Sequence, residues 1–200
     1  MACEFAPRVA ARFDPERGGV SADAPRAAPR FERRVPEGDS LERRVCADCG
    51  FIDYENPKIV AGVVAADGQG RILLCRRAIQ PSRGLWTLPA GFLEAHEAVE
   101  DGARRETWEE ARAKVTLESV LAVYSIPRIS QVQVLFRARL ISDFAPGEES
   151  LDVDLFDWEH IPWEEIAFPS VRWALRHYRE GDPSAPAFLN PPDMAGVLGD

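Results

Sequence analysis

The sequence predicts a layered α/β (α+β) domain with a mixed β-sheet, preceded by a small separate module. Between residues 58 and 161, runs rich in β-branched residues alternate with turn signals, which is typical of strands. Residues 98–111 and 170–181 carry small or apolar positions at helical spacing. A chain of 200 residues suits a domain of ordinary size, and strands with two helices pack as layers around one core.

Composition divides the chain into four segments. Residues 1–30 are rich in Ala, Pro, Arg and Gly without periodicity, and we expect them to form a disordered tail. Residues 31–57 form the small module, and residues 58–182 form the main domain. We expect residues 183–200 to be a loose C-terminal tail.

The strands of the main domain are expected from their composition and from the turns between them. The runs KIVAGVVAAD and RILLCRR are separated by DGQG, a hairpin signal. GLWTLPAGF, residues 84–92, is a loop or a short strand. Later strands are expected at residues 114–126, 131–141 and 151–161, the last of them running into a turn.

Charge and composition exclude several classes of protein. The formal charge of −9 argues against general nucleic-acid binding, which needs Lys and Arg to neutralise phosphates. No apolar run approaches the length that crosses a bilayer, and we expect no membrane partner and no secretory signal. Four cysteines do not form a disulfide framework in a chain of this length, so we expect a reducing, cytoplasmic setting.

Residues 91–113, GFLEAHEAVEDGARRETWEEARA, contain a dense group of acidic side chains. On a helix, Glu106, Glu109 and Glu110 stand at i, i+3 and i+4 and therefore share one face. Like charges at these spacings repel by about 0.2–0.5 kcal/mol per pair. Three converging carboxylates make an oxygen-rich site that suits Mg²⁺ or Mn²⁺. The alternative is a solvated acidic face.

The spacing around these glutamates favours the metal site. Gly91 precedes Glu97 by six positions, and the pair Arg105-Glu106 follows after seven intervening residues, ahead of Glu109-Glu110. This pattern resembles the Nudix box, and the chain is identified as similar to Nudix hydrolases, which implies an α/β/α sandwich. Arg105 is expected to pair with Glu97 or with Glu109 in a structural role.

One position departs from the box. The Nudix box normally closes with a glycine where this chain has Arg112, followed by Ala113 in the usual aliphatic place. A glycine there favours the exit from a helix, where a left-handed residue is often needed. We therefore expect the helix to run on for another turn in this chain.

The resemblance extends over roughly residues 31–180. It points to the branch of Nudix hydrolases that carries an N-terminal zinc ribbon and includes FAD and ADP-ribose pyrophosphatases. In that branch the ribbon has two Cys-x-x-Cys pairs, and this chain keeps only Cys46 and Cys49, with Ala24 and Ala27 in place of the other pair. Because a structural zinc needs four ligands, we expect a degenerate, metal-free ribbon unless Cys3 or a second subunit completes the site.

The resemblance also implies a mechanism. Mg²⁺ or Mn²⁺ held by Glu106, Glu109 and Glu110, with a backbone carbonyl near Gly91, would bind the diphosphate of a nucleotide substrate and activate a water. The products would be two monophosphates. A general base is expected from the loop that carries Glu148 and Glu149, although either residue is also explained as a solvated acid.

Further substrate contacts are expected outside the box. Arg76 and Arg77 end a strand and are candidates for phosphate binding, with the alternative that one of them is a surface partner for acidic residues. Arg128, with Gln131, lies in a loop after a strand. Trp86 either stacks on a base or fills the core. Cys75 is expected to be a small buried hydrophobic residue.

Two classes of function remain open from the sequence. The first is a metal-dependent pyrophosphatase acting on FAD, ADP-ribose or NADH, or alternatively on another nucleoside diphosphate derivative. The second is a non-catalytic nucleotide-sensing Nudix domain. The presence of all three box glutamates favours the enzyme. A homodimer is one arrangement that the resemblance allows.

Overall fold

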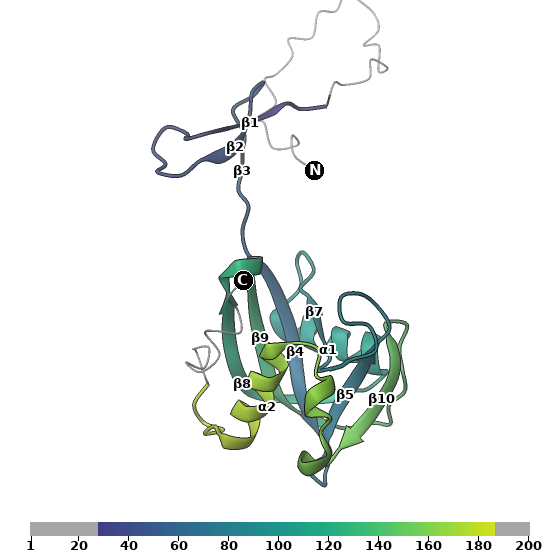
Figure 1. Cartoon of the computed structure of the whole chain (residues 1–200). Coiled ribbons are helices and arrows are strands. Elements are labelled where there is room, and N and C mark those ends of the chain that lie inside the picture. The colour runs from purple at the N-terminus through teal and green to yellow at the C-terminus, as the bar shows by residue number, and fades with distance from the viewer. Residues whose placement is uncertain (1–27, 187–200) are drawn as a thin grey trace, which may run out of the picture. The chain divides into compact units, whose positions relative to one another are not determined.

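The computed structural model describes residues 28–186, which divide into two compact units at the boundary between Asn56 and Pro57 (Figure 1). Most of the two expected tails, residues 1–27 and 187–200, lies outside the described residues. Within the described part of the chain, no helix has the length and apolar character needed to span a membrane.

The N-terminal unit is a small antiparallel sheet of three strands in the order β1-β2-β3. Its strands are β1 (Phe31–Arg34), β2 (Arg43–Cys46) and β3 (Ile52–Asp53). Val45 and Cys46 are buried at its centre. The turn before β2 is held by Asp39, which accepts a hydrogen bond of 2.8 Å from the Arg43 guanidinium, and this bond is the largest cause lowering the pKa of Asp39 to about 2.

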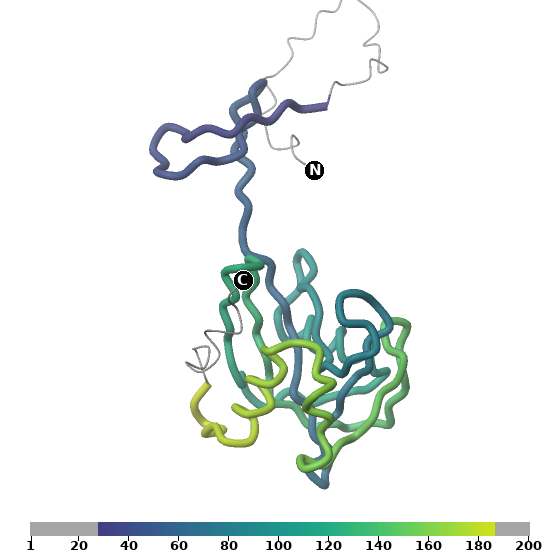
Figure 2. The backbone as a smooth tube through the Cα atoms, in the orientation of Figure 1, coloured from purple at the N-terminus to yellow at the C-terminus, as the bar shows by residue number. Residues whose placement is uncertain are grey.

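The second unit is built on a mixed sheet of seven strands. Its backbone path can be followed in Figure 2. Five of them follow the order β10-β5-β4-β9-β8, while β6 pairs with β5 and β7 pairs with β4. Only β4 and β9 run parallel; the other pairs are antiparallel. The strands are β4 (Lys58–Ala66), β5 (Ile72–Arg77), β6 (Trp86–Thr87), β7 (Ala90–Phe92), β8 (Val115–Ile126), β9 (Gln131–Leu140) and β10 (Ser150–Phe156).

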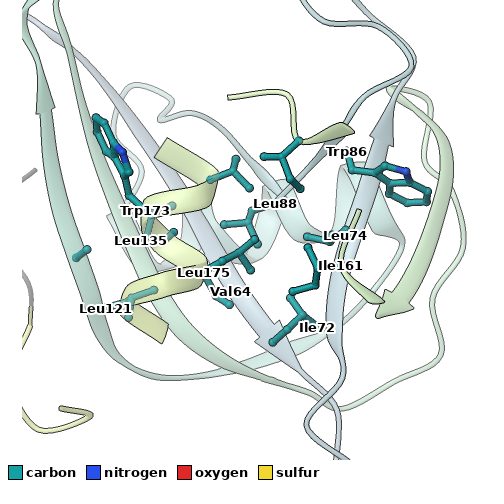
Figure 3. Close-up of a cluster of buried hydrophobic side chains, with 14 of the residues drawn as sticks. Val64, Ile72, Leu74, Trp86, Leu88, Leu121, Leu135, Ile161, Trp173 and Leu175 are labelled. Carbon is teal, nitrogen blue, oxygen red and sulfur yellow. The ribbon is translucent and has the colours of Figure 1, made fainter. Parts of the chain in front are cut away.

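The two α-helices lie on opposite faces of this sheet. The side chains of β4 alternate between the faces, so that Val63 packs in the cluster beneath α1 (Val99–Ala111) and Val64 in the cluster beneath α2 (Pro169–Glu180). Figure 3 shows the second cluster, in which Trp173 and Leu175 of α2 face the strands. The predicted layered α/β fold with two helices is confirmed.

Helix α2 is fixed to the sheet at its C-terminal end by a buried arginine. The guanidinium of Arg137, on β9, donates hydrogen bonds to the carbonyl oxygens of His177 and Tyr178, at 3.0 and 2.9 Å. These carbonyls belong to the last turn of the helix, where backbone donors become scarce. The His177 carbonyl also accepts a hydrogen bond of 2.9 Å from the N–H of Gly181. A buried cation is thereby solvated by the negative end of the helix.

Candidate active site

A cleft of about 930 Å³ opens in the second unit, a volume within the usual range for small-molecule sites. One part of its wall is acidic and comes from α1 and from the loop before β10. The other part is mostly neutral and comes from β7, β9, the 3₁₀ turn Pro127–Ile129 and the start of α2. The carboxylates that line the cleft are Glu94, Glu106, Glu109, Glu110, Glu148 and Glu149.

Glu110 lies at the base of the acidic wall and is buried, with 6% of its surface exposed. Burial raises the pKa of its carboxyl to about 8, and the nearby charge of Glu106 acts in the same direction. The backbone N–H of Ala90 donates a hydrogen bond of 3.2 Å to the carboxylate and opposes the shift. A carboxyl at this depth is costly to ionise without a cation beside it.

Glu106 stands one turn before Glu110 on the same face of α1 and is also buried. Burial raises the pKa of its carboxyl, while a hydrogen bond from Arg105 lowers it. The backbone of Gly91 passes so close that a Cβ at that position would overlap the Glu106 carboxylate. Glycine is therefore the residue that lets β7 approach the glutamates of α1.

Arg105 connects the carboxylates of this wall. Its guanidinium donates two hydrogen bonds to Glu97, at 2.8 and 3.0 Å, which lower the pKa of the Glu97 carboxyl. It also donates to Glu106 at 2.7 Å and to Glu109 at 2.9 Å, and to the carbonyl oxygen of Phe92 at 3.0 Å. Both pairings expected from the sequence are present, and the arginine offsets part of the repulsion among the glutamates.

The loop before β10 carries Glu148 and Glu149 and is fixed to the C-terminal end of α1. The N–H of Gly147 donates to the carbonyl of Glu110 at 3.0 Å, and the N–H of Ala145 donates to the carbonyl of Ala111 at 2.9 Å. The charge of Glu149 is among the causes that raise the pKa of both Glu106 and Glu110. Of the two candidate bases, Glu149 is therefore the one coupled to the buried carboxyls.

The two neighbouring arginines at the end of β5 differ in position. Arg77 lines the cleft, and its charge favours ionisation of Glu110. Its Nε atom donates to the carbonyl of Pro81 at 2.8 Å, and its guanidinium lies over the ring of Phe168. Arg76 does not line the cleft and donates instead to the carbonyl of Gly84 at 2.8 Å. The sequence did not separate these two residues.

Trp86 belongs to the core. It is 8% exposed, its ring meets Phe156 edge to face with centroids 4.9 Å apart, and it does not line the cleft. The assignment of Trp86 to substrate binding is thus corrected in favour of the core alternative, because a fully packed indole has no face free for a base. Arg128 and Gln131 do line the cleft.

Helix α1 ends earlier than the sequence predicted. It stops at Ala111, and Arg112 takes up the left-handed conformation with φ 47° and ψ 27°. The expectation of another helical turn was wrong because the carbonyls of Glu110 and Ala111, which such a turn would use, accept hydrogen bonds from the loop before β10. Arg112 therefore occupies the conformation in which the Nudix box normally has glycine.

Comparison with known proteins decides the family. The NUDIX domain family matches residues 56–180, and the family described as Nudix N-terminal matches residues 28–55. The chain belongs to the Nudix family. It is a Nudix hydrolase with the zinc-ribbon type of N-terminal unit, as the resemblance implied.

Similar proteins of known name or structure support this assignment. A crystal structure of a NUDIX hydrolase from Nitrosomonas europaea is 44% identical, with a TM-score of 0.76, covering 84% of this chain and 97% of that one. An ADP-ribose pyrophosphatase from Methanocaldococcus jannaschii is 30% identical over 60% of this chain and 76% of its own length. An NAD-capped RNA hydrolase, NudC, from Chromobacterium violaceum is 30% identical over 70% of this chain, which spans 52% of that protein.

The ribbon-type unit of this Nudix hydrolase keeps one Cys-x-x-Cys pair. Cys46 is buried and Cys49 is exposed, and both thiols are free. Hydrogen bonds from the backbone N–H groups of Cys49 and Asp48 lower the pKa of the Cys46 thiol. Cys3, Ala24 and Ala27, on which the zinc expectation also depends, lie outside the described residues.

Several cleft residues of the Nudix domain were not found by sequence reasoning. Gln133 from β9 and Ser170 and Trp173 from α2 line the neutral part of the cleft. They reach it from strands and helices far from the box in sequence. The one available signal was the alternation of glutamine with valine at the start of β9, where Gln131 and Gln133 point to the same side.

Proposed function

We propose that this Nudix hydrolase is a metal-dependent pyrophosphatase that splits a dinucleotide such as ADP-ribose, NADH or FAD into two monophosphates. The observation that carries the proposal is the pair of buried carboxyls, Glu106 and Glu110, in the wall of a cleft large enough for a dinucleotide. The names of relatives support the substrate class, since they include an ADP-ribose pyrophosphatase and a human NAD(P)H pyrophosphatase.

Nudix hydrolases generally need divalent metal ions, and the donor set here suits a hard ion. Within residues 28–186, no group of three or more His, Cys, Asp or Glu side chains is already arranged around a metal position. The nearby donors are nevertheless all oxygens: Glu106, Glu109, Glu110 and the backbone around Gly91. Such a set fits Mg²⁺ or Mn²⁺. When bound, the ion would supply positive charge for the diphosphate and acidify a water.

The chain's own residues would position the carboxylates, bind the phosphate and accept a proton. Arg105 shares its guanidinium among Glu97, Glu106 and Glu109, and so holds three carboxylates within one small region. Arg77, on the cleft wall, would bind a phosphate oxygen. Glu149 would accept the proton of the attacking water, because its loop is fixed against α1 and its charge already acts on Glu106 and Glu110.

Cleavage of the diphosphate linkage in a panel of substrates tests this proposal, measured as release of AMP from the small nucleotides and of nicotinamide mononucleotide from the capped RNA. The panel contains ADP-ribose, NADH, FAD, NAD-capped RNA and a nucleoside triphosphate, each with Mg²⁺ or Mn²⁺. We expect metal-dependent cleavage of a dinucleotide, reduced at least about 100-fold in kcat by Glu110→Gln. Glu165→Gln, an exposed acid that does not line the cleft, is the matched control and should retain activity. Folded wild-type protein that cleaves nothing in the panel would refute the enzyme and favour a nucleotide sensor.

A further inference from the structure

The end of α1 forms an edge of the cleft that the proposed reaction does not use. Arg112 lines the cleft, whereas Trp108, one turn earlier on the helix, does not. The Arg112 guanidinium lies over the Trp108 ring, 5.8 Å from its centroid, and the Lys114 ammonium is 6.0 Å from the same centroid. The cleft therefore leads through an arginine to an indole that is 45% exposed and lies near a second cation.

The backbone at Arg112 makes this arrangement costly. A side chain in the left-handed conformation is less favourable than glycine, and φ at Arg112 is 47°. A residue held in such a conformation at the rim of a site is a reason to look for function in its side chain. Arginine at this position places a cation at the cleft, which glycine would not provide.

The charges at this edge are free for a ligand. Arg104 and Arg105, on the same helix, form ion pairs with Asp101 and with Glu97, Glu106 and Glu109. In the described part of the chain, no carboxylate lies within 4.0 Å of the charged groups of Arg112 or Lys114. A guanidinium and an ammonium with this freedom, on a protein of net charge −9, can bind phosphate. An exposed indole can stack on a base.

We propose that Arg112 and Trp108 bind the adenosine half of a substrate that carries a further phosphate on its ribose. This inference rests on the proposed function, which places the diphosphate at the glutamates next to Arg112. The indole stacks on adenine, and Arg112 with Lys114 contacts the additional phosphate. A 2′-phosphate of a dinucleotide and the 3′-phosphodiester of an RNA chain share this chemistry.

Binding of product-like nucleotides separates these sources without depending on turnover. The probes are AMP, adenosine 2′,5′-bisphosphate and adenosine 3′,5′-bisphosphate, measured by titration calorimetry with Mg²⁺ present. We expect at least one bisphosphate to bind about tenfold more tightly than AMP. Preference for the 2′,5′ isomer assigns the site to a phosphorylated dinucleotide, and preference for the 3′,5′ isomer assigns it to an RNA chain.

Variants locate the effect. Arg112→Gly, which restores the residue suited to the left-handed conformation, should reduce the bisphosphate preference to within about twofold. Trp108→Ala should weaken all three probes by about tenfold. Arg179→Ala is the matched control, because Arg179 lies over Trp158 at 5.5 Å and neither residue lines the cleft; the preference should persist in it.

Two results overturn the inference. One is equal affinity of wild-type protein for the three probes, including no binding of any. The other is a bisphosphate preference that survives in Arg112→Gly. Hydrolysis of the substrate panel is measured separately, so a protein that cleaves dinucleotides but shows no bisphosphate preference retains the proposed function and loses only this subsite.

Discussion

At the scale of single residues, Glu110 shows most directly how burial and charge oppose each other in the cleft. Its carboxyl ionises near pH 4.5 in the unfolded chain and near pH 8 in the folded, metal-free protein. Between these values the folded state holds a proton that the unfolded state has released, so stability falls as pH rises. The slope is up to about 1.4 kcal/mol per pH unit.

Glu110→Gln should therefore stabilise the metal-free protein, and by more at high pH. The neutral amide has no charge to bury, so we expect the variant to gain about 3 kcal/mol over wild type between pH 5.5 and pH 8. Urea unfolding in EDTA at both pH values measures this difference. Glu165→Gln, an exposed acid, should show no such dependence; an equal gain at both pH values would contradict the assignment of burial as the cause.

Gly147 decides whether the loop with Glu148 and Glu149 can reach the helix. A Cβ at this position would collide with the backbone carbonyl of Glu109, which cannot rotate away as a side chain can. We expect Gly147→Ala to lower the free energy of unfolding by about 1–3 kcal/mol and to reduce kcat at least about tenfold. Thermal unfolding and the AMP assay measure the two effects.

Gly68 provides the control for this change. It lies in the turn between β4 and β5, and a Cβ there would meet nothing within 4 Å. Gly68→Ala should leave both stability and turnover near wild type. Normal activity in Gly147→Ala would show that the loop does not need its contact with α1.

At the scale of elements, the attachment of α2 depends on Arg137. Replacing it with methionine keeps most of its length but removes the hydrogen bonds to the carbonyls of His177 and Tyr178, of which the His177 carbonyl keeps the N–H of Gly181 as a donor. We expect Arg137→Met to cost about 1–3 kcal/mol in urea unfolding, because the Tyr178 carbonyl loses the hydrogen bond that offsets its desolvation. Arg139→Met, two residues along the same strand and exposed, should cost less than about 0.5 kcal/mol.

The elements also show why sequence reasoning succeeded locally and failed at a helix end. The spacing of Glu106, Glu109 and Glu110 fixes a shared face once a helix forms, and the structure has that helix at Val99–Ala111. The end of the helix depends instead on the loop at residues 145–147, whose N–H groups donate to the last carbonyls of the helix. This loop is distant in sequence and has no periodic pattern. Local periodicity could not reveal that competition for carbonyl oxygens.

At the scale of the whole molecule, metal binding should raise the free energy of unfolding. An ion that binds only the folded state raises the midpoint of thermal unfolding, by about 2.7 kcal/mol in free energy at 100 times its dissociation constant. We expect Mg²⁺ to raise the midpoint of wild-type protein and EDTA to reverse the rise. Glu110→Gln should respond weakly. An equal response in this variant would place the stabilising ion elsewhere.

The fold class and the cluster of box residues were predictable because both depend on short-range patterns. The neutral wall of the cleft was not, since Gln133 and Trp173 reach it only after β9 and α2 have packed on the same sheet. Trp86 shows the same limit: its neighbour Phe156 is 70 positions away, so only tertiary packing could separate a core tryptophan from a stacking one.

The parallel pairing of β4 with β9 has a consequence for biosynthesis. Lys58 pairs with Gln131, so the central strand emerges from the ribosome long before the strand that covers its edge. Until residues near 140 are translated, the apolar strand β4 has unpaired backbone N–H and C=O groups along the edge that pairs with β9. Such delayed, non-local pairing slows folding and exposes nascent chains to aggregation. The sheet of the Nudix unit is therefore completed only some time after its central strand, β4, has been synthesised.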